Sequence, residues 1–245
     1  MCANYKPTKY RWIRDRFGIL SHENDLFPID TPTTNLRPHM KGPIVFDHEG
    51  RRRMELANFG ITPRDYLPEG RKSLATFNAR TETVGSKPNF SQSWKAGRLC
   101  LIPADYFTEP RYTADDSSFE WWNISLASGE PACIAGLWKA WPTKDGGVTY
   151  GMTMLTVNCD DHPLLRLFHR NFDKKTGAPE EKRSVVIIRE SQFDEWLMCR
   201  DPEQARSFFS LLPADELHAD AAWAIAEKAQ DVSQSHQAKA ADPSK

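Results

Sequence analysis

The sequence predicts a single α+β domain that is mainly β. Compact apolar and β-branched runs are separated by turn residues, which is typical of strands, while helical patterns are confined to short stretches. No internal repeat and no linker interrupts residues 1–215. From about residue 216 the chain becomes rich in Ala, Gln, Asp and Lys and loses apolar periodicity, so we expect residues 216–245 to form a largely disordered tail.

Residues 1–102 contain one basic stretch and several short predicted elements. Lys6–Arg16 carries five basic residues with aromatic residues between them. In chain order after it, we expect an extended proline-rich stretch over Phe27–Pro43, a hairpin of Ile44–Phe46 and Met54–Phe59, an apolar run over Leu74–Phe77, a short helix over Phe90–Ala96 stopped by Gly97, and a strand over Leu99–Ile102 that meets Pro103.

Strands dominate the second half of the predicted domain as well. We expect strands over Trp121–Leu126, Ala132–Trp138, Tyr150–Val157 and Ser184–Ile188, and a helix beginning in Ser191–Leu197. Asp201, Pro202 and Gln204 form a helix start with an acidic N-cap, and this helix should run to about Leu212.

Composition excludes several protein classes. The formal charge of the 245-residue chain is −1, so a nucleic-acid site would have to be a local basic patch. The five cysteines are widely spread with no CxxC pair, which argues against a disulfide framework or a zinc site. The N-terminus lacks a signal-peptide pattern and no apolar run is long enough to span a membrane. We therefore expect a cytoplasmic protein.

Cys2 is chemically unusual because it directly follows the initiator methionine. Removal of Met1 would place a free α-amine and a thiol on adjacent carbons, and both are partly nucleophilic near neutral pH. An aldehyde can form an imine with such an amine, and the thiol can then close a five-membered thiazolidine ring. Taken alone, a second-position cysteine is more often an accident of a disordered terminus than a functional residue.

A first polar cluster follows the Leu74–Phe77 run. Strand alternation places Asn78, Arg80 and Glu82 on one face. An amide and a guanidinium suit the orientation of a hydroxyl group and the binding of a phosphate. A solvated edge strand would show the same pattern.

Two further polar segments offer groups for proton transfer. Glu109 lies among aromatic residues, and a positioned carboxyl can exchange protons with a substrate. His169 is a second such group, with His162 as a rival in the same stretch. One helical turn would place Arg166 and Arg170 on the same side of this segment. Each group could also be an ordinary surface residue.

Taken together, these motifs resemble the SRAP family, the SOS-response-associated peptidases that act as abasic-site sensors. The resemblance covers about residues 1–212 and rests on Cys2, Asn78-Ala79-Arg80-Thr81-Glu82-Thr83, Cys100-Leu101-Ile102-Pro103-Ala104-Asp105 leading to Glu109, Ala135-Gly136-Leu137-Trp138, and Leu155-Thr156-Val157-Asn158 leading to His169. It implies an open barrel-like β core with short peripheral helices.

The resemblance also implies roles for particular residues. Cys2 would form a thiazolidine crosslink with the aldehyde of an abasic site in single-stranded or junction DNA. Asn78 would position the sugar or the amine, Glu109 would shuttle protons, and His169 would assist sugar opening. Arg80 and Arg170, with Arg11 and Arg14 from the basic stretch, would bind DNA phosphates. The family also implies self-cleavage that removes Met1 and a lyase activity, with no cofactor or metal, and we expect a monomer.

The chain departs from the family pattern at several positions. Ala3-Asn4 replaces Gly-Arg, Pro110 replaces a tryptophan, and Arg170-Asn171 replaces Asp-Arg after the histidine. These changes concern the DNA contacts more than the covalent chemistry. Two other functions remain compatible with the sequence: an N-terminal-nucleophile peptidase or amidohydrolase, and a non-covalent DNA-binding module with an inert Cys2.

Overall fold

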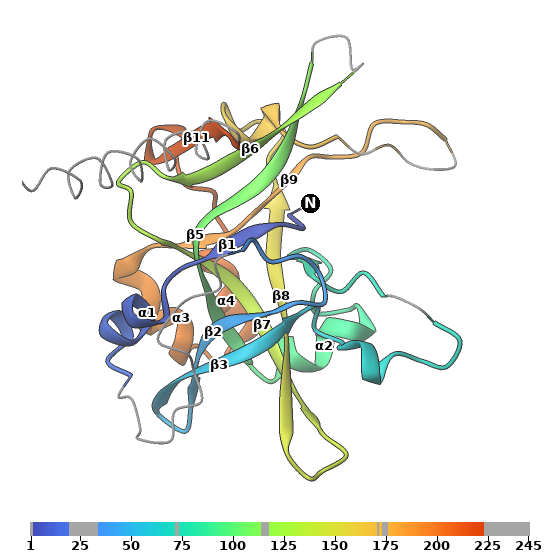
Figure 1. Cartoon of the computed structure of the whole chain (residues 1–245), viewed down its shortest axis with the longest axis vertical. Coiled ribbons are helices and arrows are strands. Elements are labelled where there is room, and N and C mark those ends of the chain that lie inside the picture. Colours follow the sequence, from blue (N-terminus) through green and yellow to red (C-terminus); the bar gives the residue numbers. More distant parts are fainter. Residues whose placement is uncertain are drawn as a thin grey trace, which may run out of the picture.

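The structure is a computed structural model that describes residues 2–19, 34–71, 74–113, 118–170, 172 and 176–222. Within these ranges the chain forms an 11-stranded mixed β-sheet with short helices around it (Figure 1). None of the helices in the described ranges is long and apolar enough to cross a membrane. The first part of the proline-rich stretch predicted over Phe27–Pro43, residues 27–33, lies outside them, and its last residues, from Lys41, belong to a strand.

The predicted hairpin is confirmed and is longer than expected. Strands β2 (Lys41–His48) and β3 (Arg51–Phe59) pair in antiparallel register from Lys41–Asn58 to His48–Arg51. Glu49 and Gly50 both have positive φ angles, 56° and 74°. Two consecutive left-handed residues form the kind of tight turn that matches the twist of paired strands.

Five strands close into a mixed barrel. Besides β2 and β3 they are β5 (Leu99–Tyr112), β7 (Ala132–Pro142) and β8 (Val148–Asn158). The contacts run β2–β3–β8–β7–β5 and return to β2, with β3 and β8 parallel and the other pairs antiparallel. The barrel-like core implied by the family resemblance is therefore confirmed.

The prediction that the strand beginning at Leu99 ends at Pro103 is wrong, because β5 continues to Tyr112. Residues 99–104 pair with β7 inside the barrel, and residues 107–112 pair with β6 outside it. Pro103 lies near the end of the pairing with β7, where a missing backbone N–H is more easily tolerated than at the centre of a sheet. One continuous strand therefore links the barrel to the Glu109 segment.

Six further strands surround the barrel in the described residues. They are β1 (Tyr5–Pro7), β4 (Asn78–Arg80), β6 (Phe119–Leu126), β9 (Arg183–Val185), β10 (Ile187–Ile188) and β11 (Leu217–Ala221). The strand predicted over Ser184–Ile188 is divided at Val186 because β9 pairs with β8 and β10 pairs with β7. β11 pairs with β6, so the ordered chain continues past residue 215, the boundary predicted from composition. Residues 223–245 of the predicted tail lie outside the described residues.

The helices are short. They are α1 (Tyr10–Phe17), α2 (Pro88–Lys95), α3 (Phe193–Met198) and α4 (Pro202–Ala205), with 3₁₀ turns at Arg64–Tyr66, Leu165–Leu167, Glu190–Gln192, Arg206–Phe208 and Ala214–Glu216. The Asp201 side chain caps α4 by accepting a hydrogen bond from Glu203 N at 2.9 Å. The helix predicted to reach Leu212 ends earlier, because Phe208 and Phe209 leave the helical path to pack against Trp196.

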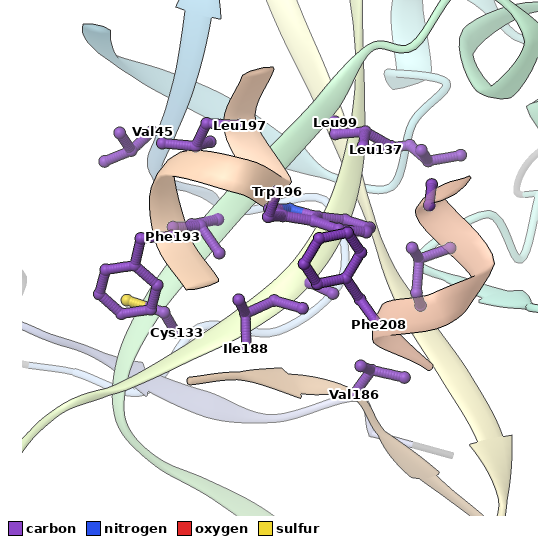
Figure 2. Packing of buried hydrophobic residues seen from close by; sticks show 14 of the residues in the cluster. Val45, Leu99, Cys133, Leu137, Val186, Ile188, Phe193, Trp196, Leu197 and Phe208 are labelled. Atoms are coloured by element: carbon purple, nitrogen blue, oxygen red, sulfur yellow. The ribbon is translucent and has the colours of Figure 1, made fainter. Parts of the chain in front are cut away.

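Alternate residues of the barrel strands belong to two buried clusters. One cluster is covered by the helices and centres on Trp196, whose indole N–H donates to Cys100 O at 2.9 Å (Figure 2). The other contains Cys2, Tyr5, Ile102 and Phe107. This division follows the two-residue period of a β-strand. It places the N-terminal residues and the helices against different faces of the sheet.

Candidate active site

Cys2 is held in the fold by the strand that follows it. The Asn4 carbonyl accepts a hydrogen bond from Thr108 N at 2.8 Å, and Tyr5 exchanges two backbone hydrogen bonds with Leu36. β1 is therefore fixed on both edges, between β5 and the segment around Leu36. Cys2 is only 1% exposed. The N-terminal segment is part of the packed structure and not a free end.

Asn78 contacts Cys2 directly. Its side-chain Nδ2 donates a hydrogen bond to the Cys2 carbonyl oxygen at 2.6 Å. Since a carbonyl can only accept, this contact fixes the orientation of the Asn78 amide. Asn78 Oδ1 is buried and has no hydrogen-bond partner among the described residues. That oxygen can therefore accept from an amine or hydroxyl in the site.

Glu109 and His169 meet beside this pair. Glu109 Oε2 lies 3.5 Å from His169 Nδ1, and the carboxyl side chain is 6% exposed. Neither ring nitrogen of His169 makes a hydrogen bond within the part of the chain that the structure describes. The Glu109 carboxylate also acts electrostatically on Cys2. The structure thus brings Cys2, Asn78, Glu109 and His169 to one region.

His169 adopts a backbone conformation that few residues with a side chain adopt. Its φ is 51°, and its N–H donates to Pro110 O at 2.7 Å. A left-handed conformation at a residue other than glycine costs about 1–3 kcal/mol and is often found at functional sites. Because the chain leaves helical geometry at Phe168, the single helical turn expected for Arg166 and Arg170 does not form.

The rival histidine, His162, has a different environment. Its Nδ1 accepts hydrogen bonds from Leu164 N and Leu165 N at 3.2 and 3.0 Å, and its Nε2 lies 2.8 Å from Leu212 O. Both ring nitrogens are thus used to hold backbone. His162 is part of the scaffold of this loop, and His169 is the histidine beside Glu109.

The environment of Cys2 keeps its thiol protonated. Burial, reinforced by the nearby Glu109 carboxylate, raises the pKa of the Cys2 thiol well above its usual range. Cysteine nucleophiles that act as thiolates have lowered pKa values instead.

Arg80 is half-exposed and belongs to a network of charges. Its Nη1 lies 3.0 Å from Glu181 Oε1, and the same carboxylate oxygen lies 2.6 Å from Arg183 Nη1. Arg183 is buried and also makes two hydrogen bonds to Glu82, at 2.6 and 2.7 Å. The cluster combines two guanidinium groups with two carboxylates, so its formal charges cancel. Glu181 therefore reduces the positive charge that Arg80 offers to an anion.

The other proposed phosphate-binding residues lie in two places. Arg170 directly follows His169, and its guanidinium lies 5.8 Å from the centre of the Tyr112 ring. Arg11 and Arg14 lie on α1, whose buried residues belong to the helix-covered cluster. Exposed Arg11 forms an ion pair with Asp15 at 3.7 Å. Figure 1 shows α1 well separated from the N-terminal end of β1. The structure therefore does not bring Arg11 and Arg14 together with Cys2.

Sequence reasoning missed Glu181 and Arg183. The available signal was the charged run Glu180-Glu181-Lys182-Arg183 immediately before a buried strand. An arginine at the start of such a strand needs a carboxylate partner, and Glu82 was already placed on a polar face. No group of three or more metal-ligating side chains occurs within the described ranges.

Comparison with known families identifies the family of this chain. The family model described as SOS response associated peptidase (SRAP) matches residues 1–228. The chain belongs to this family. The resemblance to the SRAP family that we noted in the sequence is therefore confirmed.

Two relatives of this SRAP protein carry the same description. The abasic site processing protein YoqW of Bacillus subtilis (strain 168) is 26% identical over 217 residues, covering 83% of this chain and 89% of that protein. The abasic site processing protein YobE of the same organism is 26% identical over 190 residues, covering 77% and 79%.

Solved structures show the same fold. A protein from Bordetella bronchiseptica superposes with a TM-score of 0.72 at 28% identity, covering 90% of this chain and 99% of that one. A protein from Bacteroides thetaiotaomicron has a TM-score of 0.68 at 17% identity, covering 90% and 91%. The second likeness concerns the fold alone.

Proposed function

We propose that this SRAP protein captures abasic sites in single-stranded DNA by a covalent bond from Cys2 after removal of Met1. The observation that carries the proposal is the arrangement of Cys2 beside Asn78 and the Glu109–His169 pair. The description of its relatives as abasic site processing proteins supports the same substrate. A ring-opened abasic site presents the aldehyde that an amino-thiol can trap.

The proposed reaction is a condensation that releases one water molecule. The Cys2 α-amine adds to the C1′ aldehyde, and loss of the carbonyl oxygen as water leaves an imine. The thiol sulfur then bonds to C1′, and the thiol proton passes to the nitrogen, which closes the thiazolidine ring. No oxidant, metal or cofactor enters this balance.

Each neighbouring side chain has a role in these steps. Glu109 accepts a proton from the α-amine and returns it to the departing hydroxyl group. His169 exchanges the proton that opens the deoxyribose ring, held in place by Glu109 and by its hydrogen bond to Pro110. Asn78 fixes the Cys2 carbonyl and offers its oxygen to the amine or sugar.

The burial of Cys2 and the chemistry that each route needs favour crosslinking over the peptidase alternative. A peptidase would need a thiolate to attack an amide carbonyl, whereas imine formation begins with the amine. In the crosslinking route the thiol acts only after the imine has formed. We restrict the proposed peptidase step to removal of Met1.

The DNA should be bound through phosphate contacts near the site. Arg80 and Arg170 are the nearest candidates, and Arg11 and Arg14 can contact only a more distant part of the strand. We propose that one copy of the chain suffices for capture.

A denaturing gel tests the proposal. Incubation of the mature chain with an abasic single-stranded oligonucleotide should give a stable stoichiometric adduct. Cys2→Ala should give none, and Cys133→Ala, which removes a buried cysteine of the helix-covered cluster, should still give it. Mass spectrometry should find the adduct on a chain that begins at Cys2. Equal adduct from Cys2→Ala, or repeated release of product, would exclude the proposal.

A further inference from the structure

The β5–β6 hairpin carries exposed aromatic side chains. Phe119 and Trp121 are 47% and 49% exposed, which is high for large apolar residues. The Phe119 ring lies 5.5 Å from that of Tyr112 and 5.3 Å from that of Trp121, measured between ring centres. Figure 1 shows this hairpin projecting beyond the body of the protein. The three rings form a continuous aromatic surface on a protruding arm.

The aromatic surface occupies one face of the β5–β6 hairpin. Tyr112 pairs with Phe119, and Pro110 pairs with Trp121, so alternation directs all four toward the same side. Glu109 pairs with Trp122 and belongs to the other side. The aromatic surface therefore lies on the opposite face of the hairpin from the Glu109 side chain.

Arg170 connects the two sides. It directly follows His169, which contacts Glu109, and its guanidinium lies over the Tyr112 ring at 5.8 Å. The backbone hydrogen bond from His169 to Pro110 fixes this segment along the edge of β5. A strand that leaves the Cys2 site past Arg170 would therefore reach the aromatic surface next.

We infer that Tyr112, Phe119 and Trp121 form a stacking surface for the bases of single-stranded DNA that flank the abasic nucleotide. Aromatic rings beside a guanidinium are the usual means of binding single strands without sequence preference. An abasic nucleotide leaves its neighbours without a stacking partner on one side, and an aromatic ring can take that place. The inference rests on the proposed function, because it assumes that DNA is the substrate.

Non-covalent binding isolates this contribution from the crosslink. In a Cys2→Ala background, fluorescence anisotropy would measure the Kd for an undamaged oligo-dT strand. Trp121→Leu and Phe119→Leu should each weaken binding by about fivefold or more. Trp121→Phe keeps an aromatic face and should bind nearly as tightly as the parent. Val148→Ala, which alters an exposed apolar residue of the β7–β8 hairpin, should have no effect.

The outcomes separate this inference from the proposed function. An adduct in the parent chain, together with unchanged oligo-dT binding in Trp121→Leu, would overturn the stacking surface alone. Absence of any adduct with weakened oligo-dT binding would exclude the crosslink and leave the stacking surface supported. Equal loss in Trp121→Phe and Trp121→Leu would also overturn it. Concentration-dependent self-association lost in Trp121→Leu would assign the surface to a second copy instead, and circular dichroism would verify that each variant is folded.

Discussion

The carboxylate of Glu109 and the imidazole of His169 lie 3.5 Å apart although they come from different segments of the chain. Glu109 belongs to β5, and His169 is held against the same strand in a left-handed conformation. This pair places two groups that can exchange protons beside Cys2. Its chemistry can be tested without altering the barrel.

Glu109→Gln preserves the shape of the side chain and removes its proton-accepting charge. We expect adduct formation to slow by about 100-fold, which is typical of the loss of a positioned acid or base. A quenched time course on a denaturing gel would give the rate. Glu130→Gln, in an exposed turn, is the control for the change in charge. A Glu109→Gln rate within twofold of the parent would remove the assigned role.

Asn78→Asp replaces the donor that contacts the Cys2 carbonyl with a carboxylate. Loss of the hydrogen bond should lower the free energy of unfolding by about 1 kcal/mol. Repulsion between the carboxylate and the carbonyl should displace Cys2 and slow crosslinking by roughly tenfold. Asn89→Asp, on the exposed start of α2, provides the matched comparison. Similar rates for the two variants would contradict the positioning role of Asn78.

Glu181→Gln should strengthen the binding of DNA. The substitution removes the negative charge that Glu181 places 3.0 Å from Arg80, so the guanidinium can interact more strongly with a phosphate. We expect the Kd for undamaged single-stranded DNA to fall about threefold to fivefold, and its dependence on salt to steepen by about 0.7 in logarithmic slope.

Glu180→Gln is the control for this prediction. It makes the same change in total charge at the neighbouring exposed position. Binding that is tightened equally by both variants would reflect net charge alone and would argue against a specific effect on Arg80.

The Glu82–Arg183 pair should make stability depend on pH. Burial alone would raise the pKa of Glu82, but hydrogen bonds from Arg183 outweigh it and lower that pKa. A carboxyl with a lowered pKa in the folded state stabilises the protein above its unfolded pKa, and this contribution disappears as the pH falls through the folded value. Glu82→Gln should therefore lower the Tm by about 3 °C at pH 7 and by much less near pH 3. Thermal melts of the parent and of Glu82→Gln at both pH values give this difference in Tm. The same difference at both pH values would contradict the prediction.

Gly136→Ala tests the packing of the barrel. An added Cβ would lie 2.8 Å from both Ile102 Cδ1 and the Thr153 carbonyl oxygen. Such overpacking costs about 1–3 kcal/mol, so the Tm should fall by roughly 3–10 °C. Gly147→Ala, in an exposed turn, should change the Tm far less. Equal melting temperatures for both variants would show that the strands can move apart.

Local patterns predicted the parts of the fold that depend on local interactions. The β2–β3 hairpin follows from apolar runs on both sides of a Gly-containing turn, and the start of α4 follows from its N-cap at Asp201. The strand β11 was missed because residues 217–221 have a weak apolar pattern, and their order comes from pairing with β6. The length of β5 was also missed, since a proline was taken to end the strand, whereas β5 passes through Pro103 and then pairs with β6 from Phe107.

The candidate site shows the same limit. Cys2, Asn78, Glu109 and His169 could be selected from the sequence because their motifs resemble a family. The resemblance also favoured His169 over His162, and the structure agrees, because both nitrogens of His162 bind backbone atoms. The ion pair between Arg80 and Glu181 joins distant segments, so no spacing pattern indicated it.

Strand β5 serves two regions of the molecule with one uninterrupted backbone. A substitution at Leu101 or Ile102 would shift the strand within the barrel and, through it, the position of Glu109. The melting temperature and the rate of adduct formation should therefore decrease together in such variants. Any stabilising substitution in β5 should therefore be tested for the rate of crosslinking as well as for the melting temperature.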